Sequence, residues 1–461
     1  WLVAKHDRNP SRAAKRFRPF AKSDWSGKRI AIQLGGTLLA LAVDHGGGIF
    51  FLDSRVQQPT RIRLTEKGLR TLAECHHRGE LTVRPQFLPM VDPPLRWNGI
   101  DGGGYREISL SLVKRDDDLQ VREALKKADL RTVCEAVNAI QATPYQINDH
   151  VAAVFQRAYE RMGPAAVLPA LAIPAMPPPL PTETTPPEEY EKRRADRRRV
   201  RRLHAMAVAN LIALEGRRAM VDLLINRVIY FPHQVDLRSR AYPIPQEIHP
   251  QADDLGRALI EFARGKPLGE RGAFWLAVHL ASLYGQRIDK LSFEKRVEWV
   301  RDHQDRILDS AARPLDGAMF WTTAEKKWRF LAAVFEWAGY VAEGPGYVSH
   351  VPVAMDGTCN GMQHLSALGR DPVGGAWTNL VPNGEPRDLY QEVANHLQTI
   401  VDEDAANGNA MALLWNPCIK RALVKQATMT TPYGVTVSGM IKQLRSVILE
   451  DEAYRARFPD E

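Results

Sequence analysis

The stretch WNPCIKRALVKQATMTTPYG, residues 415–434, decides how the rest of the chain is interpreted. Arg421, Lys425, Met429 and Tyr433 follow one another at intervals of four residues, which places their side chains on one face of a helix. The proline and glycine that flank Tyr433 predict the helix end. Two cations, an apolar platform and a terminal aromatic ring suit nucleotide binding. The alternative is an amphipathic helix with two solvated bases, which the two apolar members of the face disfavour.

A second informative stretch is VPVAMDGTCNGMQHLS, residues 351–366. It predicts an apolar strand-like run that ends at Asp356-Gly357 and leads into a helix beginning near Asn360. A carboxylate followed by a glycine carbonyl is a natural ligand for Mg²⁺, which prefers oxygen donors. An isolated Asp-Gly pair usually marks only a turn. The metal assignment therefore depends on the wider pattern.

A third stretch, FPHQVDLRSRAYPIP, covers residues 231–245. Asp236, Arg238, Arg240 and Tyr242 alternate, and a period of two predicts one face of an extended strand. Two guanidinium groups on one strand face can bind phosphate. A surface ion pair between Asp236 and Arg238 explains the same pattern equally well.

Composition indicates a folded chain with a polyanionic partner. Its 461 residues suffice for about three domains, and 44% apolar with 25% charged residues exclude a wholly disordered or coiled-coil protein. The 62 Lys and Arg against 54 Asp and Glu leave a net charge of +8, which favours nucleic acid. Four scattered cysteines form no metal or disulfide pattern, and no stretch approaches the ~20 apolar residues of a membrane span.

Proline and glycine divide the chain. Residues 46–52 predict a turn and a short strand after an apolar helix at 29–43. Four prolines and four glycines in 85–105 predict an extended segment crossing the surface, and nine prolines in 162–188 predict a spacer. The arginine-rich run 192–202 is either a solvated helix face or a phosphate contact.

Together these residues resemble a known family. The pattern R-x3-K-x7-Y-G, which ends at Tyr433-Gly434, occurs after DGTCNGMQHLSALGRDPVGGAWTNL (356–380) and VDLRSRAYPIP (235–245). In that order the three are similar to the single-subunit, bacteriophage-type DNA-directed RNA polymerases. The similarity extends through 85–105, 264–272 and 334–340. It implies two-metal phosphoryl transfer, in which the protein positions the reactants and neutralises charge.

The resemblance also implies roles for single residues. Asp356, with Gly357, would bind the catalytic Mg²⁺ ions, and the second aspartate of the two-metal site is expected beyond residue 461. Lys425 would hold phosphate and protonate the leaving pyrophosphate. Further positions are expected to bind the incoming nucleotide (Arg421, Tyr433, Tyr390) and the nucleic acid (Arg238, Arg240).

The fold implied is mostly α with a small mixed sheet (α+β), the right-hand polymerase fold with thumb, palm and partial fingers. The expected parts, in chain order, are 1–117, the end of an N-terminal domain; 118–225, thumb-like helices with the spacer 162–188 and the basic run 192–202; 226–265 and 350–384, palm; 266–349, a helical palm insertion; and 385–461, partial fingers. The chain starts at Trp1, and it contains no His-Asp-Ser motif, in which the family carries its second catalytic aspartate. We therefore expect a fragment that makes no RNA alone.

Two alternatives remain open. A related DNA polymerase would carry glutamate and an aromatic residue where this chain has Gly361 and Met429, so Gly361 is expected to leave room for a ribose hydroxyl. A non-catalytic, nucleic-acid-binding prophage remnant is the second. The expected partners of the enzyme are double-stranded DNA template, nascent RNA and ribonucleoside triphosphates. We expect a monomer, away from membranes, in the cytoplasm of an infected bacterial host rather than in a mitochondrion.

Overall fold

The computed structural model describes residues 50–53, 61–64, 87–114, 118–163, 187–237, 240–384 and 386–458. The predicted helix at 29–43, most of the predicted spacer and Arg238 lie outside these residues. The chain divides into two compact units: residues 1–88 with 162–222, and residues 89–161 with 223–461.

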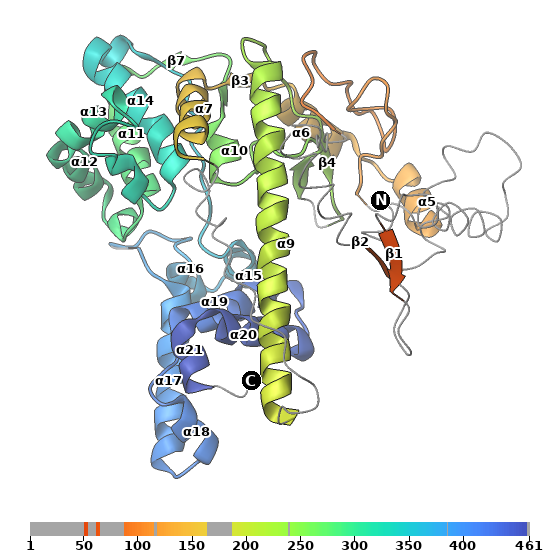
Figure 1. Cartoon of the computed structure of the whole chain (residues 1–461), viewed down its shortest axis with the longest axis vertical. Helices are drawn as coiled ribbons and strands as arrows, with labels where there is room; N and C mark the ends of the chain where they lie inside the picture. The colour runs from red at the N-terminus through yellow and green to blue at the C-terminus, as the bar shows by residue number, and fades with distance from the viewer. Residues whose placement is uncertain are drawn as a thin grey trace, which may run out of the picture. The chain divides into compact units, whose positions relative to one another are not determined.

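The described part of the first unit is a hairpin and a long helix. Strand β1 (Phe50–Asp53) pairs antiparallel with β2 (Arg61–Leu64), which confirms the strand predicted at the end of 46–52. Helix α9 (Pro187–Leu224) runs for 38 residues and carries the basic run in its N-terminal part (Figure 1). Proline is tolerated at the first position of a helix because its missing N–H has no intrahelical partner there.

The second unit contains three further antiparallel strand pairs. Strand β3 (Tyr145–Ile147) pairs with β6 (Ile260–Phe262), β4 (His233–Val235) with β5 (Ala241–Pro243), and β7 (Lys266–Pro267) with β8 (Val348–Ser349). A parallel bridge joins Val113 to Val235. Each pair is too short to be stable without the helices that pack around it.

Helices make up most of the second unit, and they confirm the mostly helical class with a small β component. In chain order they are α5 (Leu119–Lys127), α6 (Arg131–Gln141), α7 (Asp149–Met162), α10 (Asp254–Ala258), α11 (Gly269–Tyr284), α12 (Phe293–Asp302), α13 (Gln304–Ala312), α14 (Lys327–Glu343), α15 (Asn360–Gly369), α16 (Pro372–Trp377), α17 (Leu389–Ala406), α18 (Ala410–Trp415), α19 (Arg421–Thr430), α20 (Val437–Glu450) and α21 (Glu452–Arg457). None of the described helices combines the length and hydropathy that crossing a bilayer requires.

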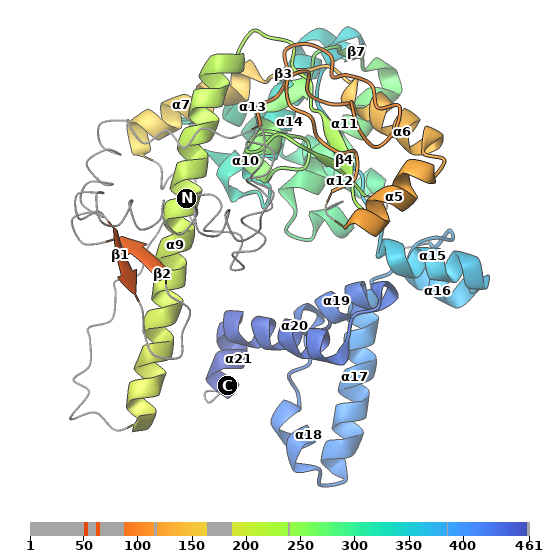
Figure 2. The same cartoon turned by 90° about the vertical axis from the view of Figure 1, so that its right-hand side faces the viewer.

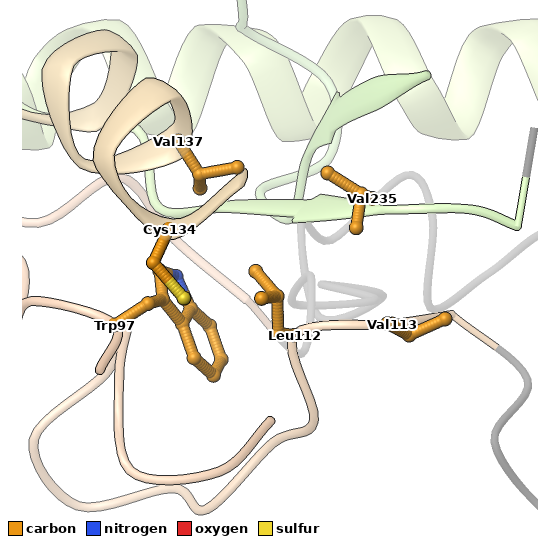
Figure 3. Close-up of a cluster of buried hydrophobic side chains, with 6 residues drawn as sticks. All are labelled: Trp97, Leu112, Val113, Cys134, Val137 and Val235. Atoms are coloured by element: carbon orange, nitrogen blue, oxygen red, sulfur yellow. The ribbon is translucent and has the colours of Figure 1, made fainter. Parts of the chain in front are cut away.

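The described part of the predicted segment, residues 87–105, has no helix and is exposed at many positions, as expected, but it also sends side chains into the core. Figure 3 shows Trp97 in a cluster of buried side chains from three parts of the chain, and only 1% of Trp97 is exposed. Asn138 accepts a hydrogen bond from the Trp97 backbone N–H (2.8 Å) and donates one to its carbonyl (2.9 Å). A side chain at Gly103 would collide with the indole ring. The glycines therefore allow the chain to fold closely around Trp97.

The helices near the C-terminal end of the described chain pack against one another (Figure 2). Helix α19 packs against both α17 and α20, and it also contacts α15. Leu423 on α19 is buried in a cluster with Ile448 and Tyr454. Because this side of α19 is occupied by apolar packing, its remaining faces are available for polar side chains.

Candidate nucleotide-binding site

Helix α19 presents the predicted row of side chains. Arg421, Lys425 and Met429 lie on the helix, and Tyr433 lies in the 3₁₀ turn Thr431–Tyr433 that follows it. Lys425 is exposed to solvent. Met429 and Tyr433 are also exposed, with exposed fractions of 42% and 57%. The predicted helix is thus confirmed, except that it ends before Tyr433.

The two cations of α19 converge on the ring of Tyr390. The guanidinium carbon of Arg421 lies 5.2 Å from the ring centroid, and Nζ of Lys425 lies 5.9 Å from it. Both distances are within the range of cation–π attraction. Burial, followed by a hydrogen bond with Cys359, raises the pKa of the Tyr390 hydroxyl well above its usual range. Tyr390 is therefore a neutral platform that gathers two positive charges.

Asp388 holds Arg421 in place, and sequence reasoning did not select it as a site residue. The Nε atom of Arg421 donates to Oδ2 of Asp388 at 2.7 Å. The same carboxylate caps α17 by accepting from the backbone N–H groups of Tyr390 (3.1 Å) and Gln391 (3.2 Å). Burial would raise the pKa of Asp388, but these hydrogen bonds outweigh it and keep the pKa below its ordinary value. Asp388 is therefore charged near neutral pH.

The run before Asp356 is not a strand. Residues 351–357 have no regular secondary structure, and Val353 (54% exposed) and Met355 (92% exposed) point away from any core. The pairing of β7 with β8 ends at Ser349, and no described strand lies beside the run to supply hydrogen bonds. A strand needs such a partner. Asp356 itself is exposed and accepts a hydrogen bond from the Gly357 N–H at 2.9 Å.

Both ends of this run are anchored. At its start, the His350 N–H donates to Oε1 of Glu336 (3.1 Å), and the Phe262 N–H donates to the His350 carbonyl (2.9 Å). At its end, α15 begins at Asn360 as predicted. A Cβ atom at Gly357 would meet the side-chain oxygens of Asn360 and Gln363, so any larger residue between Asp356 and the helix would make these side chains move.

Gly361 is a packing position. A Cβ atom at Gly361 would lie 2.8 Å from Cβ of Pro432 and 3.1 Å from Cε2 of Tyr433. A side chain at Gly361 would therefore meet Pro432 and Tyr433, while the expectation that Gly361 leaves room for a ribose hydroxyl stays a prediction. The missing side chain lets α15 approach the turn that carries Tyr433.

The residues 231–245 form a hairpin and not the single predicted strand. The chain reverses between Val235 and Ala241, which are opposite each other in the β4–β5 register. Asp236 stabilises the reversal, because its carboxylate accepts from the Arg240 N–H (3.1 Å) and from the Tyr242 hydroxyl (3.1 Å). Nη2 of Arg240 donates to the hydroxyl oxygen of Tyr433 at 3.2 Å. This contact joins two segments 193 residues apart.

The donors suited to a metal ion are few. No group of three or more His, Cys, Asp or Glu side chains that could hold a metal occurs among the residues that the structure describes. Asp356 provides one exposed carboxylate beside a glycine carbonyl. This oxygen donor set suits Mg²⁺ in kind, but it is too small to hold two ions.

Two families match the chain. Residues 266–459 match the family of DNA-dependent RNA polymerase, and residues 66–142 match the DNA-directed RNA polymerase N-terminal family. The chain belongs to the phage-type, single-subunit DNA-dependent RNA polymerases. This confirms the resemblance carried by the motifs around Asp356 and Tyr433.

Relatives of this polymerase chain are found in organelles. It is 35% identical over 404 residues to DNA-directed RNA polymerase 2, chloroplastic/mitochondrial, of Arabidopsis thaliana, which covers 83% of this chain and 38% of the relative. It is 35% identical over 368 residues to the mitochondrial enzyme of Schizosaccharomyces pombe, and this match covers 78% of this chain and 32% of the relative. For the mitochondrial enzyme of Neurospora crassa the identity is 37% over 383 residues, and this match covers 79% of this chain and 26% of the relative. The chain thus spans at most 38% of the length of these three relatives.

These names correct the predicted location of the polymerase chain. We expected a phage protein in the cytoplasm of an infected bacterium, and that prediction is wrong because the matching relatives are mitochondrial or chloroplastic.

Proposed function

We propose that this chain forms the nucleotide-binding part of an organellar DNA-dependent RNA polymerase, which transfers ribonucleotides from triphosphates to the 3′ end of RNA. The convergence of Arg421 and Lys425 on Tyr390, close along the chain to Tyr433, supports the proposal most strongly. The organellar assignment derives from the names of the relatives. A DNA template, nascent RNA and ribonucleoside triphosphates are the proposed partners, and a monomer the proposed state.

Each polar residue of the site has a proposed task. Arg421 and Lys425 neutralise the triphosphate, and the Lys425 ammonium donates a proton to the leaving pyrophosphate. Asp356 and the Gly357 carbonyl would hold Mg²⁺, which supplies Lewis-acid stabilisation of the attacking and leaving oxygens when bound. Arg238 would contact nucleic acid. The chain by itself is proposed to make no RNA, because the described residues offer too few carboxylates for a two-metal site.

The parts predicted from sequence map onto this proposal. Helix α9 would belong to the thumb, the β4–β5 hairpin and the Asp356 run to the palm, and α17 to α20 to the fingers. The helices α11 to α14 would form the insertion in the palm. Under this assignment, α19 carries the cations of the fingers, and α15, which contacts α19, lies in the palm.

Removing only the hydroxyl of Tyr433 tests the proposal most directly. In the complete polymerase, Tyr433→Phe is expected to lower the ratio of kcat/KM for a ribonucleotide to that for its deoxy analogue by about 2- to 13-fold, since one hydrogen bond contributes about 0.5–1.5 kcal/mol. Ribonucleotide incorporation should stay close to normal because the ring remains. An unchanged ratio would show that the sugar is not selected at Tyr433.

A second test addresses Arg421 through Asp388. Asp388→Asn keeps a good N-cap for α17 but removes the charge that pairs with Arg421. We expect KM for ribonucleoside triphosphates to rise by about 3- to 10-fold, with a small fall in melting temperature, because a charged hydrogen bond contributes about 1.5–3 kcal/mol and only part of it is lost. Steady-state extension assays measure this.

The control for that test is Asp371→Asn. Asp371 caps α16 in the same way, by accepting from the Val373 N–H at 2.9 Å. An equal rise in KM for Asp371→Asn, or no rise for Asp388→Asn, would contradict the role of Asp388.

A further inference from the structure

We propose that Arg240 is a positioning residue for Tyr433 and thereby sets the selectivity of the polymerase for ribose over deoxyribose. The inference rests on the proposed role of Tyr433 in sugar selection and extends it to a residue on another element. Its basis is the hydrogen bond from Nη2 of Arg240 to the Tyr433 hydroxyl oxygen, 3.2 Å long.

The backbone of Arg240 is held firmly by the turn that precedes β5. The Asp236 N–H donates to the Arg240 carbonyl at 2.9 Å, and the Arg240 N–H donates to the Asp236 carboxylate at 3.1 Å. The Tyr242 hydroxyl donates to the other carboxylate oxygen at 3.1 Å, while Nζ of Lys114 lies 4.2 Å from the Tyr242 ring centroid. The backbone position of Arg240 is therefore fixed, although its side chain is exposed.

Tyr433 is restricted from its other side by α15. The ring edge lies against Gly361, where even a single added carbon would come within 3.1 Å of Cε2. Pro432, beside the same glycine, limits the turn that carries Tyr433. The Tyr433 ring is thus placed by the Gly361 backbone, and its hydroxyl by Arg240.

The chemistry of the pair gives the hydroxyl a direction. A guanidinium group donates hydrogen bonds and accepts none, so in this contact the phenolic oxygen is the acceptor. The O–H hydrogen of Tyr433 is then free to donate to a different group. A ribose 2′-oxygen can accept that hydrogen bond, and a deoxyribose cannot. Arg240 therefore orients the proton that would distinguish the two sugars.

A double-mutant cycle in the complete polymerase tests this coupling. The ratio of kcat/KM for a ribonucleotide to that for its deoxy analogue is measured in the parent, Arg240→Ala, Tyr433→Phe and the double variant. We expect Arg240→Ala alone to lower the ratio in the same direction as Tyr433→Phe, by about two-fold or more. In the Tyr433→Phe background it should lower the ratio no further, because the hydroxyl on which it acts is gone.

Two more variants separate positioning from simple loss of charge. Arg240→Lys keeps a donor-only side chain and should recover part of the ratio. Arg271→Ala removes an exposed arginine on α11 and should leave the ratio and both rates unchanged.

The remaining outcomes overturn the inference. If Arg240→Ala lowers both rates equally, or changes the ratio by the same factor with and without the Tyr433 hydroxyl, then Arg240 acts on nucleic acid or on another group. If Tyr433→Phe leaves the ratio unchanged, the proposed role of Tyr433 fails first and that of Arg240 fails with it. If Tyr433→Phe changes the ratio and Arg240→Ala does not, only the role of Arg240 fails.

Discussion

Replacing Asp356 by asparagine is expected to reduce RNA synthesis by the complete polymerase about a thousandfold or more, while binding of the template persists. Asparagine keeps the shape of the side chain and removes the charge that would bind Mg²⁺. Metal stabilisation of a phosphoryl-transfer transition state contributes several kcal/mol, and about 4 kcal/mol corresponds to three powers of ten. Asp356 is exposed and outside regular structure, so the substitution should leave folding intact.

Single-nucleotide extension of an RNA primer on a DNA template measures the rate, and fluorescence anisotropy of a labelled template measures binding. Asp402→Asn is a suitable control, because Asp402 is an exposed carboxylate on α17 that accepts a hydrogen bond from the Gln398 side-chain amide (2.6 Å). Near-normal extension by Asp356→Asn would end its assignment as a metal ligand. Loss of template binding in parallel would mean that the substitution disturbs more than the metal.

Replacing Lys425 by alanine is expected to depress incorporation of ribonucleotides and deoxynucleotides alike, by about 10²- to 10³-fold, the usual cost of removing one donor to developing charge. Both sugars are affected equally because a phosphate contact does not depend on the sugar. Arg421 should stay in place, since Asp388 and the Tyr390 ring hold it independently of Lys425. The measurement is kcat/KM for both kinds of nucleotide.

Lys425→Arg separates the two tasks proposed for Lys425. Arginine keeps the positive charge but does not release its proton, so KM should recover while kcat stays low. Lys442→Ala, at an exposed lysine on α20, serves as the control. A preferential loss of one sugar, or full recovery of kcat by arginine, would contradict the acid role.

The sequence predicted local features better than contacts between distant segments. The four-residue spacing of Arg421, Lys425 and Met429 correctly predicted α19, because the period of a helix depends only on the chain itself. The same period could not identify Asp388 or Arg240 as neighbours. Asp388 carried a recognisable N-cap signal before α17, but its partner Arg421 follows 33 residues later.

Two predicted strands were wrong for different physical reasons. Alternation in 231–245 predicts one strand, although a hairpin places residues on both its strands with the same period of two. The Asp236 carboxylate, which closes the reversal, gave no signal of its own. The run 351–355 has strand-like composition, but composition does not supply the neighbouring strand that regular pairing requires.

The pairing of β3 with β6 has a consequence for how the protein emerges from the ribosome. Gln146 on β3 and Glu261 on β6 are joined by a hydrogen bond across 115 residues, and the residues between them include α9. At a synthesis rate of about 5–20 residues per second, β3 waits roughly 6 to 23 s for its partner. Until Ile229 and Phe231 are made, just after α9, the Tyr145 backbone lacks the residue with which it exchanges two hydrogen bonds, and the Tyr145 ring lacks one of its aromatic contacts. An early-binding chaperone is therefore expected to protect the nascent protein mainly while the long helix is being made.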